Sequence, residues 1–319
     1  MKKIVKKIIY IISSLVVVLF ILGLILAFLP IESKVKNKAV SMEEAATLRQ
    51  NFTEAHHLFS TSDGEILFLR KWNPDSIETA KKDIAILIFH GITAHSGAYP
   101  MAGKIISSGG YTTFGLDYRG HGLSGGNRAD SPGKERWIAD LTEAVNYIKG
   151  LGYPKVIIMG HSLGVAAALY ATISIPDEVS GLMLLSGGYE GKKRESTPIP
   201  FFQKAKILAS SIFRPSKQAV EYYREDMTGA NDPLFNFRYT LRFLSMMDVT
   251  ELILPEHLNI PVLVAVGDKD ELFEVDQVKE VYDDVPGNKK EFLVLENTYH
   301  ATFPDASWEK LVVWLNNNF

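Results

Sequence analysis

The chain contains no cysteine among its 319 residues. Disulfide bonds, thiolate metal sites and a cysteine nucleophile are therefore excluded, and the fold depends on its core alone. The sequence also lacks an H-E-x-x-H pair, and no glycine-rich loop matches a phosphate-binding or dinucleotide-binding fingerprint. Its Asp, Glu and His residues are scattered, without the spacing of a metal site. We therefore expect chemistry that uses neither a metal ion nor a cofactor.

The chain has little excess charge, since 34 Lys and Arg residues against 37 Asp and Glu residues give a net charge of −3. This balance hides an asymmetry. Residues 1–38 hold seven lysines and one glutamate, a charge of +6, which leaves −9 for the other 281 residues. An acidic main domain argues against nucleic acid as a partner. The composition, with 46% hydrophobic and 22% charged residues, is that of a globular protein.

Charged residues are absent from Ile8 to Leu29, a run of 22 residues. A helix of that length spans about 33 Å, which is enough to cross the hydrocarbon core of a bilayer. A cleaved signal peptide normally has a shorter apolar region, of about 7–15 residues, followed by small residues at the cleavage site. A buried core helix would show a polar side to water. The run therefore predicts an uncleaved membrane anchor rather than either alternative.

Lysines on the two sides of this run bear on its orientation. Four of them precede it (Lys2, Lys3, Lys6 and Lys7), and three follow it (Lys34, Lys36 and Lys38). The positive-inside rule places the amino terminus in the cytoplasm, although the later lysines weaken the bias. We expect a single-pass protein of the cell membrane whose main domain lies outside the cytoplasm.

Strand-like and helix-like patterns alternate after residue 56, which predicts a mostly parallel sheet with helices on both faces. The alternation stops over residues 191–258, where helical patterns occur without a clear strand, and this interruption predicts an inserted helical cap. The expected division is a membrane anchor (1–30), a stalk with a short helix at Met42–Gln50 (31–55), a core (56–190 and 259–319) and the cap (191–258). The expected strands are 56–60, 65–72, 84–89, 111–116, 155–159, 181–185, 261–266 and 291–295, and the expected helices are 101–107, 134–149, 163–174, 275–282 and 306–316.

The motif GHSLG at Gly160–Gly164 is the most informative feature of the chain. It follows an expected strand and precedes an expected helix, which is the context of a nucleophile elbow. On such a turn the hydroxyl of Ser162 projects from the edge of the sheet. The start of the following helix adds a positive end that favours a developing oxyanion. The motif predicts that Ser162 is a nucleophile.

A serine nucleophile needs a histidine base, and the base needs a carboxylate that orients it. Two histidines follow Ser162 in the chain, His257 in the expected cap and His300 just after the last expected strand. We expect His300 to be the base, because it lies at the carboxyl edge of the sheet, where ligands bind. The acid is expected on the loop Gly267–Glu271, where Asp268, Asp270 and Glu271 compete and spacing alone does not separate them.

Two backbone N–H groups are expected to bind the oxyanion. One belongs to Leu163, the residue after the nucleophile, and the other to Ile92, in the loop after the strand at residues 84–89. Gly91 allows the backbone to approach closely there. His90 precedes the nucleophile strand, and we expect it to have a structural role.

Three stretches resemble the α/β-hydrolase superfamily, in particular its monoacylglycerol lipase and lysophospholipase branch. They are an oxyanion loop with His90-Gly91, His95-Ser96 and Tyr99, the D-x-R-G-H-G-x-S loop at 117–124, and the GHSLG motif. In that family the acid stands in a G-x-x-D pattern, which Gly267 to Asp270 matches, so the resemblance implies Asp270 as the acid with Asp268 as the reserve. It also implies an α/β-hydrolase fold over residues 56–319.

The first functional hypothesis is a membrane-anchored serine hydrolase that cleaves carboxylic esters, in particular monoacylglycerols or lysophospholipids. Apolar residues of the cap, with Met246 and Met247 among them, suit a pocket for acyl chains. The alternative is an aminopeptidase or amidase of the proline iminopeptidase type, with Glu221, Glu225 or Asp226 binding the substrate amine. A second alternative is a catalytically silent binding protein on the membrane.

Overall fold

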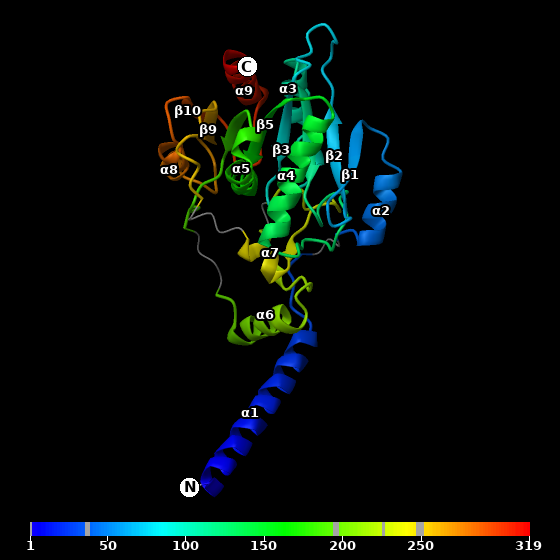
Figure 1. Ribbon diagram of the computed structural model, residues 1–319, viewed down its shortest axis with the longest axis vertical. Coiled ribbons are helices and arrows are strands. Elements are labelled where there is room, and N and C mark those ends of the chain that lie inside the picture. Colours follow the sequence, from blue (N-terminus) through cyan, green and yellow to red (C-terminus); the bar gives the residue numbers. More distant parts are fainter. Residues whose placement is uncertain (1, 36–38, 194–197, 225–226, 247–251) are drawn as a thin grey trace.

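The computed structural model of the protein describes residues 2–35, 39–193, 198–224, 227–246 and 252–319 (Figure 1). Its central element is an eight-stranded sheet with the order β1-β2-β4-β3-β5-β6-β9-β10. All neighbours are parallel except β1–β2 and β2–β4, so β2 alone runs against the other strands. The strands are β1 (His56–Ser60), β2 (Ile66–Trp72), β3 (Ile84–Phe89), β4 (Thr112–Asp117), β5 (Lys155–His161), β6 (Gly181–Leu185), β9 (Val262–Gly267) and β10 (Lys290–Leu295).

Helices cover both faces of this sheet. Buried residues of α4, α5 and α8 form one hydrophobic core with one face, and those of α3 and α9 form a second core with the other face. This arrangement confirms the predicted fold. The helices are α1 (Lys2–Phe28), α2 (Met42–Gln50), α3 (Pro100–Ser108), α4 (Lys134–Gly150), α5 (Leu163–Ser174), α6 (Phe201–Phe213), α7 (Leu241–Ser245), α8 (Val275–Asp284) and α9 (Asp305–Asn318).

The core elements lie where the sequence predicts them, with ends that differ by no more than two residues. The reason is visible in β3 and β9, in which every residue is buried. A parallel strand that is covered by helices on both sides reads as a continuous apolar run, which is a strong local signal. The strand order brings the carboxyl ends of β3, β5, β9 and β10 to the same edge of the sheet.

The region between β6 and β9 contains α6, α7 and two short paired strands, β7 (Val220–Glu221) and β8 (Arg238–Tyr239). The sequence shows no clear strand in this region, because strands of two residues are too short to give an alternating pattern. Met246 is buried in the main hydrophobic core rather than at a cavity wall. Met247, which was assigned the same role, lies outside the described residues.

The amino-terminal helix α1 projects away from the sheet, and its carboxyl-terminal end lies against α6 (Figure 1). Within the described residues, Lys3–Phe28 is the one helix that is long and apolar enough to cross a membrane. Nearly all of its side chains are exposed. The predicted short helix is α2, and a capping box begins it, since the Ser41 hydroxyl accepts a bond from the Glu44 N–H while the Glu44 carboxylate accepts one from the Ser41 N–H.

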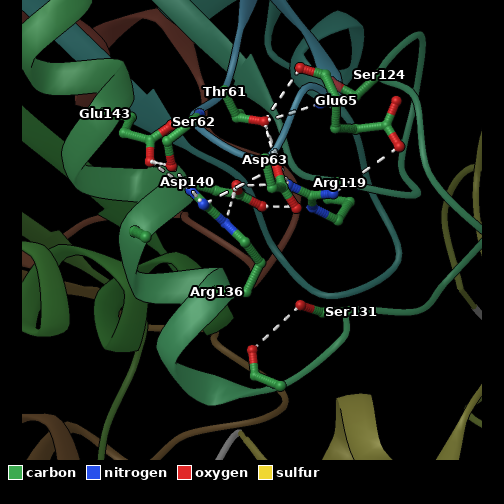
Figure 2. A network of polar contacts seen from close by, with 12 residues as sticks. Thr61, Ser62, Asp63, Glu65, Arg119, Ser124, Ser131, Arg136, Asp140 and Glu143 are labelled. Atoms are coloured by element: carbon green, nitrogen blue, oxygen red, sulfur yellow. Dashed lines mark hydrogen bonds and ion pairs between the residues drawn. The ribbon is translucent and has the colours of Figure 1, made fainter.

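A network of ion pairs fixes the 117–124 loop to the helix α4 (Figure 2). Arg119 donates from Nε to Asp140 over 2.8 Å and from Nη2 to Asp63 over 2.8 Å, while Arg136 donates from Nε to Asp140 over 2.9 Å. The side chains of Arg119 and Asp140 are only 6% and 2% exposed. A buried charge needs such partners, so the arginine of the D-x-R-G-H-G-x-S loop has a structural task.

Candidate active site

Ser162 occupies a strained turn between β5 and α5. Its φ of 56° and ψ of −120° lie outside the regions that residues with side chains favour. Glycines make the turn possible, because a Cβ atom on Gly160 would lie 2.1 Å from the carbonyl oxygen of Gly164, and one on Gly164 would lie 2.0 Å from that of Phe89. The GHSLG sequence therefore forms the sharp strand-to-helix turn that it predicts.

His300 and Asp270 lie beside Ser162, although both are far from it in sequence. The Nε2 atom of His300 lies 3.0 Å from the Ser162 hydroxyl oxygen, and its Nδ1 atom lies 3.1 Å and 3.2 Å from the two carboxylate oxygens of Asp270. Asp270 follows β9 and His300 follows β10, so the parallel strands deliver both to the same edge of the sheet. The structure thus brings together a hydroxyl, an imidazole and a carboxylate in hydrogen-bonding order.

The environment of Asp270 keeps its carboxylate charged. The residue is 3% exposed. Burial raises the pKa of its carboxyl group, but the hydrogen bond from His300 and the N–H groups of Leu272 and Phe273 outweigh burial and hold the pKa below its ordinary value. A charged carboxylate favours the tautomer of His300 with its proton on Nδ1, which leaves Nε2 unprotonated beside the Ser162 hydroxyl.

The other two acidic residues of this loop have different surroundings. Asp268 is exposed, and its carboxylate accepts the N–H of Thr298 over 3.2 Å. Glu271 accepts the backbone N–H of His300 over 3.0 Å, so it holds the main chain of His300 rather than its ring. Of the three acidic candidates, only Asp270 hydrogen-bonds the imidazole of His300.

The two residues that are expected to supply oxyanion donors flank Ser162. Leu163 is the first residue of α5, whose first N–H groups have no acceptor within the helix, and Ile92 and Leu163 line one cavity together with Ser162. The loop that carries Ile92 is fixed from behind, because the Asp117 carboxylate accepts the N–H of Ser96 over 2.6 Å and that of Leu123 over 2.7 Å. The D-x-R-G-H-G-x-S loop thus supports the position of Ile92.

A hydrogen-bonded series through His161 was not anticipated from the sequence. Burial and the neighbouring His300 lower the pKa of His161 to about 3, so its ring carries a single proton. That proton is on Nε2, because Nε2 lies 2.7 Å from the carbonyl oxygen of His300, which can only accept. Nδ1 therefore accepts the Tyr99 hydroxyl over 2.8 Å, and the Tyr99 oxygen accepts the N–H of Gly91 over 2.9 Å.

This series joins the loop of Gly91 to the loop of His300 through His161, the residue that precedes Ser162. The signal that could have revealed it is the histidine inside the GHSLG motif itself, at the end of an otherwise apolar strand. A polar side chain at the buried end of a strand needs partners. Nothing in the sequence, however, identifies Tyr99 and the His300 carbonyl as those partners.

Two cavities meet at Ser162. The first has a volume of about 470 Å³ and the second about 330 Å³. Both are lined by Ser162, Ile92, Tyr222, Arg224 and Leu272. The first continues along apolar side chains that include Val165, Leu169, Phe273 and Val281, and the second continues past Tyr99, Met101, Phe235, Phe303 and Trp308. The Ser162 hydroxyl thus faces a space that divides into two branches.

The remaining sequence candidates lie elsewhere. His90 is fully buried, and burial lowers its pKa to about 4, so the neutral ring accepts the Tyr118 N–H at Nε2 and bonds the Gly91 carbonyl through Nδ1. This matches the structural role that was expected. His257 is exposed in the region between β6 and β9. Across the described residues, no group of three His, Asp or Glu side chains is arranged to hold a metal ion.

Together with the family match and the relatives given below, the strand order and the strained serine turn identify a hydrolase of the α/β-hydrolase superfamily. Within that class the chain belongs to the Hydrolase_4 family, described as serine aminopeptidase, S33, whose profile matches residues 80–307. The match covers most of the sheet and all the residues discussed above as site candidates.

Relatives place the chain near one branch of that class. It is 25% identical over 279 residues to a monoglyceride lipase of Rattus norvegicus, which is 82% of this chain and 89% of that protein. It is 25% identical over 279 residues to a monoacylglycerol lipase of Mycolicibacterium smegmatis, covering 82% and 95%. The fold is similar to that of a soluble variant of monoglyceride lipase from Saccharomyces cerevisiae, with a TM-score of 0.64, 16% identity and coverage of 91% and 99%. The predicted resemblance is confirmed.

Proposed function

We propose that the chain is a membrane-anchored ester hydrolase that cleaves monoacylglycerols or lysophospholipids. The observation that carries this proposal is the line of contacts from the Ser162 hydroxyl through the His300 imidazole to the Asp270 carboxylate. The names of the relatives supply monoacylglycerol as a substrate, lysophospholipid comes from the resemblance given in the sequence analysis, and the apolar walls of the cavities at Ser162 are consistent with an acyl chain.

In the proposed mechanism Ser162 attacks the ester carbonyl carbon while His300 takes its proton at Nε2. The backbone N–H groups of Ile92 and Leu163 receive the negative charge on the carbonyl oxygen. His300 then gives the proton to the leaving alcohol, and an acyl-enzyme remains. Water, activated by His300 in the same way, releases the fatty acid and restores the hydroxyl of Ser162. Asp270 stabilises the imidazolium that forms in each half-reaction.

The proposal includes the predicted division of the chain and its position in the cell. The helix Lys3–Phe28 would cross the cell membrane, with the amino terminus in the cytoplasm and the catalytic domain on the other side. Residues 31–55 would act as the stalk and residues 191–258 as a cap over the core at 56–190 and 259–319. An enzyme that is held at the bilayer meets amphiphilic substrates at its own surface.

The surroundings of Glu221 argue against the aminopeptidase alternative. Glu221 lines the first cavity, but its carboxylate already accepts the Ser33 hydroxyl over 2.5 Å and the Lys34 N–H over 3.0 Å. A carboxylate with such partners is a weaker site for a substrate ammonium group. Glu225 and Asp226, the other acidic candidates, lie outside the described residues.

The test is a substrate panel on the full chain in detergent micelles, with monoacylglycerols, lysophospholipids, p-nitrophenyl esters and aminoacyl anilides. We expect turnover of the esters and none of the anilides. Replacing Ser162 with Ala should lower ester turnover about 10⁶-fold and abolish labelling by a fluorophosphonate probe. Preference for anilides would favour the amidase alternative, and a Ser162→Ala protein that keeps most of its rate would reject the mechanism.

A further inference from the structure

The helix α6 carries an apolar stripe that no other part of the described chain covers. Phe201, Leu208 and Ile212 are 86%, 59% and 65% exposed. Their spacing of seven and eleven residues from the first places all three on one face of the helix. Three large apolar side chains on one helix face are unfavourable in water, since each leaves an apolar surface that burial would stabilise.

The opposite face of α6 is docked on α1. The ring of Phe213 meets that of Phe20 edge-on with centroids 5.3 Å apart, and the Ser210 hydroxyl donates to the carbonyl oxygen of Ala27 over 3.4 Å. Gly23 makes room for this contact, because a Cβ atom there would lie 2.8 Å from the Phe213 ring. The two helices are therefore neighbours along the last turns of α1 (Figure 1).

Two lysine side chains, on α6 and just after it, bind carbonyl oxygens at the carboxyl-terminal end of α1. Lys206 donates from Nζ to the carbonyl oxygen of Pro30 over 3.0 Å, and Lys217 donates to those of Ala27 and Leu29 over 2.7 Å and 2.9 Å. These carbonyls at the end of a helix have no intrahelical donor, and cations are favourable at this negative end. These contacts fix the position of α6 along the axis of α1, next to its carboxyl-terminal end.

The position of α6 along α1 determines whether lipid or water surrounds the apolar stripe. The contacts of α6 run from Phe20 to Pro30 of the amino-terminal segment, a length of about 15 Å along a helix, which is half of a typical hydrocarbon core. The charge of the segment suits the boundary of that core. Residues 198–219 contain four cationic residues and no acidic one, in a chain whose residues 39–319 carry −9.

We propose that α6 is a second membrane-embedded element, which lies in the same leaflet as the carboxyl-terminal turns of α1. Its stripe of Phe201, Leu208 and Ile212 contacts lipid acyl chains, and its cationic residues lie at the level of the headgroup phosphates. This inference rests on the proposed membrane span of α1. The cap of the enzyme then lies partly in the bilayer that contains the substrate, rather than at a distance from it.

The absence of cysteine permits a direct test on the full chain. Leu208→Cys, with Ile212→Cys as an independent second position, is labelled with the environment-sensitive dye NBD and reconstituted in vesicles of phosphatidylcholine and phosphatidylglycerol. The matched positions are Leu22→Cys on α1 and Glu78→Cys on the β2–β3 loop, which lies at the opposite end of the molecule from α1 (Figure 1). All four native side chains are exposed, so the labels do not disturb the core.

We expect blue-shifted NBD emission at Leu208→Cys, Ile212→Cys and Leu22→Cys, together with loss of fluorescence when the lipids carry a nitroxide on the acyl chain. Glu78→Cys should keep the emission of a dye in water. Water-like, unquenched emission at both α6 positions with quenching at Leu22→Cys would overturn the proposal and leave the anchor intact. Blue-shifted but unquenched emission on α6 would also overturn it, since a protein surface would then cover the stripe. Unquenched emission at Leu22→Cys as well would refute the membrane span itself.

Discussion

The Nε2–H group of His161 donates a hydrogen bond to the backbone carbonyl oxygen of His300 over 2.7 Å. The residue that precedes Ser162 in sequence thus holds the main chain of His300, whose ring contacts the Ser162 hydroxyl. On its other nitrogen, His161 accepts the Tyr99 hydroxyl, which in turn accepts the Gly91 N–H. One buried ring therefore fixes the spacing between the proposed base and the proposed oxyanion loop.

Replacing His161 with Phe should lower kcat about 10- to 100-fold with little change in KM, because loss of both bonds lets the loop of His300 shift relative to Ser162. Steady-state kinetics on a soluble ester measures this. Tyr99→Phe, which removes one hydroxyl and leaves the bond from His161 to His300, should have a smaller effect. A His161→Phe enzyme with unchanged kcat would show that this bond does not position His300.

A pair of variants separates the two aspartates of the Gly267–Glu271 loop. Asp270→Asn should lower kcat about 10⁴-fold, because the amide no longer holds the correct tautomer of His300. Asp268→Asn alters an exposed carboxylate that accepts a hydrogen bond from the Thr298 N–H. The kcat of this variant should stay within a few-fold of the native value. The reverse order of effects would exchange the roles of the two residues.

Acid should destabilise the fold through three buried histidines. Burial lowers the pKa of His90 to about 4, that of His161 to about 3 and that of His121 well below its ordinary value, whereas all three are near 6.5 in an unfolded chain. The unfolded state therefore binds more protons in this range, so the stabilisation is complete above pH 6.5 and is lost as the pH falls. His90 and His161 should each contribute a loss of about 2 kcal/mol between pH 7 and pH 5, and His121 adds to it in the same direction. Urea unfolding at the two pH values measures the sum, and His161→Phe should reduce the difference by about 2 kcal/mol.

The ion pairs around Arg119 make it a residue for stability rather than catalysis. Arg119→Met leaves the buried Asp140 with Arg136 as its remaining ion-pair partner in the described structure, and should lower the free energy of unfolding by about 3 kcal/mol. Lys155→Met is the matched control, because its pair with Asp83 is half exposed and should matter little. Equal effects in denaturant titrations would contradict the assignment of Arg119 to a structural task.

Position 160 requires glycine, because the backbone of Gly164 lies too close for any side chain. A Cβ atom there would lie 2.1 Å from the Gly164 carbonyl oxygen, so Gly160→Ala should displace α5 from β5. The strained turn at Ser162 would then not form, and activity should be lost. Gly150→Ala is the control, because no atom lies within 4 Å of its Cβ position at the end of α4. That substitution should stabilise the protein by about 0.4–1 kcal/mol. Thermal unfolding and esterase assays on both variants check the contrast.

The sequence predicts the elements whose signal is local. The buried strands are continuous apolar runs, and the GHSLG motif sits between a strand and a helix, so the sheet and the position of Ser162 follow from the chain itself. The choice among Asp268, Asp270 and Glu271 required a resemblance, because three carboxylates within four residues have nearly the same spacing. Tyr99 as a partner of His161, and α6 as a partner of α1, depend on side chains that meet only after the chain has folded. No periodicity of the sequence encodes such long-range contacts.

The bonds from Ser33 and Lys34 to Glu221 have a practical consequence. A shortened form that begins after residue 40 loses both donors, so that the Glu221 carboxylate in the wall of the first cavity no longer has them. Without them, that carboxylate would repel an anionic product more strongly and attract amines. Kinetic constants from such a shortened form would therefore describe a different electrostatic environment from that of the full chain.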